Sequence, residues 1–176
     1  MGLLAQAAYA GGLDRVRELL AQGHNINERG EDNATPLNIA VYCRRDLELV
    51  RYLVEQGADL DAKDDSGNTP LRYSISTANI EIFAFLISSG ADVSSRYIGG
   101  NTVLHLIVFL VNCPNWLHCL FDAVDIDPRT LFSVKNNDGK IPLHWLKGLA
   151  SAKCLVEYGY DSSTTGLQST WMCPTL

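Results

Sequence analysis

Residues 35–40 read Thr35-Pro36-Leu37-Asn38-Ile39-Ala40, and related segments return three times along the chain. They are Thr69-Pro70-Leu71-Arg72, Thr102-Val103-Leu104-His105 and Ile141-Pro142-Leu143-His144, so the leucines are 34, 33 and 39 residues apart. Proline suits the first turn of a helix because its missing N–H needs no partner there, and a preceding threonine can cap that turn. Each segment therefore predicts a helix start, with Thr35, Thr69 and Thr102 as structural turn residues.

A second apolar set follows each segment at the i, i+3, i+6, i+7 spacing of one helix face. Its members are Leu47, Val50, Leu53 and Val54, then Ile80, Phe83, Leu86 and Ile87, then Leu117, Leu120, Ala123 and Val124, then Leu149, Ala152, Leu155 and Val156. The same set at Leu13, Val16, Leu19 and Leu20 adds a unit at the start of the chain. Glycines such as Gly57 and Gly90 mark the helix ends. Five units of this period predict a solenoid.

These motifs resemble the ankyrin repeat family, which shares Thr-Pro-Leu-x-x-Ala at 35–40, Asn79-Ile80-Glu81-Ile82, and Gly-Ala-Asp at 57–59 and 90–92. The resemblance implies an all-α solenoid of helix-turn-helix units with β-hairpin fingers. We expect a single domain over residues 1–163 and a C-terminal tail over 164–176. The expected units cover about 3–29, 30–63, 64–96, 97–135 and 136–163, of which the first and last are degenerate.

Composition excludes several classes of protein. The chain has 176 residues with 14 Lys and Arg against 20 Asp and Glu, and a net charge of -6 opposes binding to a phosphate backbone. Its longest apolar run, 106–111, is far shorter than the roughly 18 residues that span a bilayer. Five irregularly spaced cysteines favour reduced thiols. We expect an intracellular protein, cytoplasmic or nuclear, that is a monomer without an export signal, a transmembrane segment or a nucleic-acid partner.

The sequence predicts no enzyme and no cofactor, because its four histidines are spread along the chain without a nearby cluster of nucleophilic or acidic side chains. His105 and His144 occupy the histidine position of the family's Thr-Pro-Leu-His, whose implied role is hydrogen bonding between neighbouring turns. Cys113, His118 and Cys119 could supply three zinc ligands. A fourth ligand is missing, so buried thiols and a surface histidine are the preferred interpretation, and we predict no metal site.

The family resemblance implies a protein partner held by the finger tips and by the solvent side of the first helices. On the helices this indicates Tyr9, Tyr42 and Phe109, since aromatic side chains anchor interfaces. The third finger tip adds Tyr97 and Ile98, and one register of the fingers adds Arg29, Lys63, Arg96 and Lys135. For the basic residues a solvated edge is the alternative, and for Phe109 the alternative is covering an inserted loop. The predicted function is a protein-protein interaction module: an adaptor, scaffold or inhibitor.

Two modifications are also possible from the sequence. Asn27 resembles the asparagine that a cytosolic hydroxylase modifies in ankyrin repeats. Cys173-Pro174-Thr175-Leu176 has the length of a C-a-a-X prenylation sequence, although no polybasic run precedes it. The alternative function is therefore a membrane-delivered effector or adaptor, lipidated at Cys173, that reaches a membrane only through this lipid.

Overall fold

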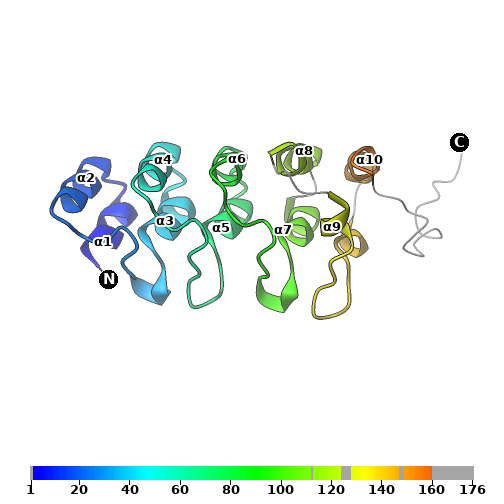
Figure 1. The fold of residues 1–176 in the computed structure, drawn as a ribbon, viewed down its shortest axis with the longest axis horizontal. Coiled ribbons are helices and arrows are strands. Elements are labelled where there is room, and N and C mark those ends of the chain that lie inside the picture. The colour runs from blue at the N-terminus through cyan, green and yellow to red at the C-terminus, as the bar shows by residue number, and fades with distance from the viewer. Residues whose placement is uncertain (1, 112, 124–127, 147–148, 160–176) are drawn as a thin grey trace, which may run out of the picture.

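The computed structural model describes residues 2–111, 113–123, 128–146 and 149–159, and these form an elongated stack of helix pairs in two rows (Figure 1). The inner row holds α1 (Leu3–Ala10), α3 (Pro36–Ile39), α5 (Pro70–Ser76) and α7 (Val103–Leu106). The outer row holds α2 (Leu13–Ala21), α4 (Leu47–Glu55), α6 (Ile80–Ser88), α8 (Pro114–Ala123) and α10 (Leu149–Glu157). No helix in this described part of the chain is long and apolar enough to cross a bilayer.

Short elements complete the units. A π-helical turn extends α3 as η2 (Ala40–Arg44), and another extends α7 as η4 (Ile107–Val111). The 3₁₀ turns are η1 (Glu31–Asn33), η3 (Ile98–Gly100) and η5 (Pro142–Trp145). A five-residue helix, α9 (Pro128–Phe132), precedes the fourth loop, which explains the wider spacing of 39 residues between the last two leucines.

Local sequence accounts for the ends of the helices. The hydroxyl oxygen of Thr35 accepts a hydrogen bond from Asn38 N–H at 3.3 Å, and Thr69 accepts one from Arg72 N–H at 3.3 Å. At the other end, Gly57 and Gly90 follow α4 and α6 with φ of 86° and 97°, the left-handed conformation in which a glycine avoids steric strain. The helix boundaries therefore follow from capping chemistry.

One continuous hydrophobic core runs along the stack between the two rows of helices. The repeat leucines Leu37, Leu71 and Leu104 are fully buried within it. Where the structure describes the side chains of the predicted apolar sets, most are buried or half-buried, but Ala123 is exposed and Val156 is 58% exposed, while Cys154 is buried. The core face of α10 is thus rotated from the one that the apolar spacing predicts. The side chains of Val124 and Leu149 lie outside this description.

The finger loops join the outer helix of one unit to the inner helix of the next and cover residues 22–35, 56–69, 89–102 and 133–141. The expectation of β-hairpin fingers is not supported, since the described residues contain no strand. Asp64 N–H bonds to Asn68 O and Tyr97 N–H to Asn101 O, so the arms of these fingers meet at a tight turn. A strand pair needs a longer ladder of such bonds.

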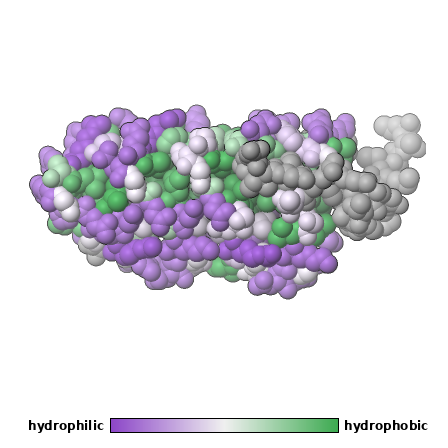
Figure 2. All heavy atoms as spheres, in the orientation of Figure 1, coloured by the Kyte–Doolittle hydropathy of each residue, from purple (hydrophilic) through white to green (hydrophobic). Residues whose placement is uncertain are grey.

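Backbone hydrogen bonds also join each of two fingers to the next. Asp65 N–H donates to Asp32 O at 2.9 Å, and Asn137 N–H donates to Gly99 O at 2.8 Å. The result is a row of loops along one edge of the stack, and Figure 2 shows this edge as mainly hydrophilic on the face in view. The expected domain end at residue 163 and the tail at 164–176 lie outside the described residues.

Candidate functional site

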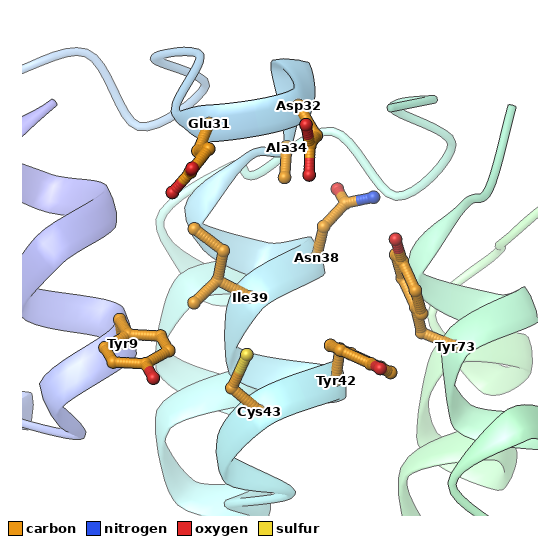
Figure 3. A pocket seen from close by; sticks show the side chains of 9 residues that line it. All are labelled: Tyr9, Glu31, Asp32, Ala34, Asn38, Ile39, Tyr42, Cys43 and Tyr73. Carbon is orange, nitrogen blue, oxygen red and sulfur yellow. The ribbon is translucent and has the colours of Figure 1, made fainter. Parts of the chain in front are cut away.

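A hollow opens on the inner face of the stack between the first finger, the helices α1, α3 and α5, and the turn η2 (Figure 3). Its volume is about 460 Å³. Aromatic, aliphatic and acidic side chains line it, together with one thiol and one amide: Tyr9, Glu31, Asp32, Ala34, Asn38, Ile39, Tyr42, Cys43 and Tyr73. The sequence pattern indicates Tyr9 and Tyr42 but not the other members, because the lining comes from a finger and from three successive units.

The aromatic wall of the hollow is built by Tyr42 and Tyr73, whose ring centroids are 4.8 Å apart. The Tyr73 hydroxyl donates a hydrogen bond to the Asp64 carboxylate in the second finger. Burial, followed by this hydrogen bond, raises the pKa of Tyr73 to about 12. Burial also raises the pKa of the Cys43 thiol. Both groups are therefore neutral at physiological pH, and the wall is apolar in character.

The rim of the hollow is acidic. Glu31 and Asp32 are exposed in η1, above the aromatic wall (Figure 3). Asp32 has a φ of 51°, a conformation that aspartate tolerates better than most residues. In this turn, the carbonyl oxygen of Asp32 accepts the hydrogen bond from the N–H of Asp65 in the second finger. The backbone of the fingers thus holds negative charge beside an apolar hollow.

Large exposed side chains form a row along the inner face that begins at the hollow and extends past it. Tyr9, Tyr42 and Phe109 are 57%, 53% and 49% exposed, and each lies five residues after its unit's leucine. Ser76 takes this place in the third unit, so the row is interrupted there. The Phe109 ring also packs on Trp145, with centroids 5.3 Å apart. Ile98 is 69% exposed at the tip of the third finger.

Tyr97 does not belong to this exposed set, which corrects the expectation for the third finger. Only 5% of Tyr97 is exposed, and its hydroxyl lies 3.3 Å from the hydroxyl of Thr69. Burial raises its pKa to about 12. The backbone turns at η3 so that neighbouring side chains face opposite ways, with Tyr97 against the preceding unit and Ile98 toward solvent.

Two of the predicted basic contacts have a structural task. Arg29 Nη1 donates to the carbonyls of Asn33 at 2.9 Å and of Lys63 at 2.8 Å. Arg96 Nη1 donates to the carbonyls of Gly100 at 3.2 Å and of Lys135 at 2.9 Å. Each arginine therefore joins its own finger to the next one. The side chains of Lys63 and Lys135 are exposed.

Buried polar side chains also join inner helices to fingers. Asn38 Nδ2 donates to the carbonyls of Ala62 and Asn68, both at 3.2 Å. His105 Nε2 donates to the carbonyl of Lys140 at 2.9 Å, and His105 Nδ1 accepts from Thr102 N–H at 3.2 Å. His144 Nδ1 accepts from Ile141 N–H at 3.1 Å and stays within its own turn.

Asn27 takes part in the contact between the first two fingers. Its Oδ1 accepts from Asp59 N–H at 2.8 Å, and one unit later Asp61 Oδ1 accepts from Asp92 N–H at 2.9 Å. The Asn27 side chain therefore has a structural role. Hydroxylation at this position remains a prediction.

The finger contacts and helix pairs described above agree with the comparison to known families. The model for ankyrin repeats, in three copies, matches residues 4–97. The chain belongs to the ankyrin repeat family. Ankyrin repeats are generally protein-protein interaction modules, and the family is typically non-enzymatic. No curated protein matches the chain.

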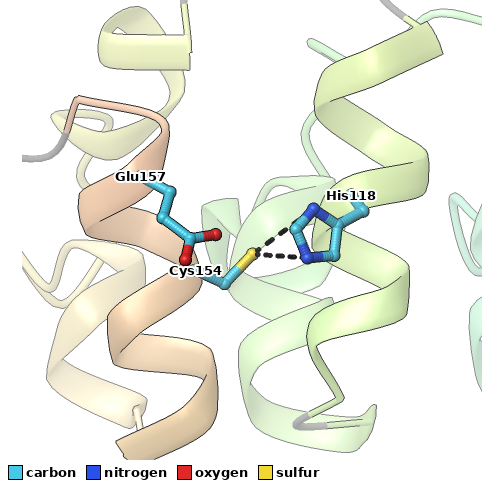
Figure 4. A group of neighbouring side chains, drawn as sticks. All are labelled: His118, Cys154 and Glu157. Atoms are coloured by element: carbon cyan, nitrogen blue, oxygen red, sulfur yellow. Dashed lines mark hydrogen bonds between the residues drawn. The ribbon is translucent and has the colours of Figure 1, made fainter.

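Beyond the residues that the family model matches, titratable groups lie together between α8 and α10 (Figure 4). His118 Nε2 lies 3.7 Å from Cys154 Sγ, and Glu157 is one helical turn after Cys154. Burial, followed by the charges of Glu157 and Asp122, raises the pKa of the Cys154 thiol to about 11. Among the described residues, Cys113 and Cys119 do not join His118 in such a group.

The sequence did not point to this pairing of His118 and Cys154, which are 36 residues apart. That distance is close to the ankyrin period and could have placed them on neighbouring outer helices. Cys173, on which prenylation depends, lies outside the described residues.

Proposed function

We propose that this ankyrin domain binds a segment of a partner protein along its inner face, with an apolar side chain of the partner in the hollow between Tyr9 and Tyr42. The observation that carries the proposal is the pair of large exposed tyrosines at a hollow, 57% and 53% exposed, on a face that core packing does not require to be aromatic. In this proposal the protein is a monomeric intracellular adaptor, scaffold or inhibitor.

The chemistry of the hollow indicates what the partner offers. Burial of one large apolar side chain stabilises a complex by about 1.5 to 3 kcal/mol. Glu31 and Asp32 on the rim favour a lysine or arginine next to that side chain, and complementary charge raises the association rate. The preferred ligand is therefore a segment with an aromatic or aliphatic residue beside a basic one. Ile98, Lys63, Lys135 and Phe109 extend the proposed contact surface along the fingers and the fourth unit.

The proposal is tested by capturing partners from a cell lysate with the wild-type chain and with the double variant Tyr9→Ser, Tyr42→Ser. A matched control is Val156→Ser, which removes an apolar side chain of similar exposure, 58%, from the outer helix α10. A protein that wild type and control retain, and that the double variant loses, supports binding at the hollow. Equal retention by wild type and both variants contradicts it.

The charge of the rim gives a second test once a partner is captured. The variant Glu31→Gln, Asp32→Asn keeps the size of both side chains and removes two negative charges. We expect slower association and a weaker salt dependence, since screening acts on the charge that steers the encounter. An unchanged association rate would show that the partner's basic residue does not approach the first finger.

A further inference from the structure

We propose that His118, Cys154 and Glu157 form a zinc site that joins the fourth unit to the fifth. The three side chains each offer one ligand atom, and these atoms lie within 4.8 Å of one another between α8 and α10 (Figure 4). This site differs from the set of Cys113, His118 and Cys119 that sequence spacing suggests, and it revises the expectation that the chain holds no metal.

The distance between sulfur and nitrogen fits zinc. With Zn–S near 2.3 Å and Zn–N near 2.1 Å, two ligands at a tetrahedral angle are about 3.6 Å apart. Cys154 Sγ and His118 Nε2 are 3.7 Å apart before any ion is considered. The backbones of α8 and α10 therefore already hold this sulfur and nitrogen at the required separation. Because Sγ is also 4.0 Å from His118 Nδ1, the imidazole ring must turn for the Nε2 lone pair to face the ion.

A chain of hydrogen bonds selects the tautomer of His118 that a metal needs. The Tyr158 hydroxyl donates to the carboxylate of Asp122, which can only accept. The Tyr158 oxygen is then the acceptor for His118 Nδ1–H at 3.0 Å. Nε2 carries the free lone pair, and it is the nitrogen nearer to the sulfur. Metal-binding histidines are commonly oriented in this way by a partner on the other ring nitrogen.

Glu157 supplies the third ligand from the solvent side. It follows Cys154 by three residues on α10, so both side chains lie on one face of that helix. Cys154 is buried and Glu157 is exposed, so the carboxylate can adjust its rotamer to close the site. A water molecule completes a tetrahedral set, and the thiol proton leaves to solvent as the Zn–S bond forms.

The mixture of one thiolate, one imidazole and one carboxylate favours zinc among the common divalent ions. Magnesium and calcium prefer oxygen ligands, whereas sulfur and imidazole nitrogen suit zinc. Bound zinc would cross-link α8 to α10, and this position is useful because η5 replaces a full inner helix in the fifth unit. The site is thus expected to stabilise the end of the ankyrin stack.

The test uses the full chain, with any affinity tag removed and metal stripped by a chelator. Zinc is titrated in competition with a chromophoric chelator, native mass spectrometry counts the bound ions, and cobalt replaces zinc for absorption spectroscopy. We expect one zinc ion per chain, a higher unfolding temperature with zinc, and a thiolate-to-cobalt charge-transfer band. No binding at one equivalent overturns the proposal.

Variants separate this site from other thiols. Cys154→Ser should abolish the charge-transfer band, whereas Cys119→Ser, which changes a half-buried thiol on the same helix as His118, should retain it. Persistence of the band in Cys154→Ser, or its loss in Cys119→Ser, contradicts the assignment.

Exposed and supporting residues keep the test decisive if Cys154→Ser does not fold. Glu157→Gln changes only an exposed side chain, and Tyr158→Phe removes the partner of His118 Nδ1. We expect zinc affinity to fall by about 10- to 100-fold in Tyr158→Phe, as for other partners of metal-binding histidines. The affinity should fall by at least tenfold in Glu157→Gln. Unchanged affinity in both variants would overturn the site.

Discussion

His105 Nε2 lies 2.9 Å from the carbonyl oxygen of Lys140, 35 residues further along the chain. A backbone carbonyl only accepts, so Nε2 carries the proton and Nδ1 is the acceptor for Thr102 N–H. One buried imidazole thus caps its own helix and holds the finger of the next unit. Asn38 performs the second of these tasks with its amide, toward Ala62 and Asn68.

Replacing His105 by alanine should destabilise the protein by about 3 kcal/mol, because a buried N–H and a buried carbonyl lose their partners. Asn is the matched control, since Asn38 shows that an amide reaches the next finger from this position. His105→Asn should therefore retain much of the stability in urea unfolding. Equal losses in the two variants would show that the hydrogen bonds contribute little.

Stability should also depend on pH through His105. Burial, and then the charges of Arg96 and His144, lower its pKa below the ordinary 6.5. The folded state then binds fewer protons than the unfolded state, so this stability is fully present above about pH 6.5 and is lost as pH falls through the lowered pKa. Urea unfolding across this range should show the decline in wild type and a smaller one in His105→Asn. Identical profiles would contradict this assignment.

The exposed side chains of the proposed binding surface should contribute little to folding. Ile98→Ser should change the free energy of unfolding by less than about 0.5 kcal/mol, as most surface changes do. Tyr42→Ser should cost more, about 0.5 to 1.5 kcal/mol, because its ring packs on Tyr73. The comparison is Leu53→Ala in the core, expected to cost about 2 to 5 kcal/mol. A loss of that size in Ile98→Ser would mean that Ile98 is not free for a partner.

Arg29 and Lys63 share a register in the fingers but should behave differently. Arg29→Ala removes hydrogen bonds to two carbonyls and should lower the free energy of unfolding by about 0.5 to 1.5 kcal/mol. Lys63→Ala removes an exposed ammonium and should leave stability nearly unchanged. Thermal unfolding of the two variants side by side checks this contrast, and a larger loss in Lys63→Ala would reverse the roles assigned to them.

Tyr97 should respond as a core residue. Tyr97→Phe keeps the ring and loses the contact with the Thr69 hydroxyl, at an expected cost of about 1 kcal/mol. Tyr97→Ala leaves a cavity and should cost about 3 to 5 kcal/mol. Calorimetry of both variants tests the assignment, since a surface position would show almost no difference between them.

Much of this architecture could be predicted from local patterns. The Thr-Pro-Leu segments specify where inner helices begin because capping and proline act within four residues. The apolar spacing predicts the outer helices because it reflects contacts within a few helical turns. It predicts the wrong buried face for α10, where Cys154 is buried and Val156 is exposed. The expectation of β-hairpin fingers is not supported: backbone hydrogen bonds close the turn of a finger and join neighbouring fingers, and the described residues contain no strand.

The grouping of the candidate functional residues could not be predicted from the sequence, because it depends on how the units pack together. Tyr9, Asp32, Tyr42 and Tyr73 come from three units, and no spacing rule says that they enclose one hollow. Sequence spacing offered only Cys113 and Cys119 as neighbours of His118 and led to no metal site, whereas packing of α8 on α10 brings Cys154 to it. Periodicity and capping are local properties of a repeat, so they can be predicted from the amino-acid sequence. Which side chains meet across units depends on how each helix rotates against its neighbours, and that is settled by core packing over the whole stack.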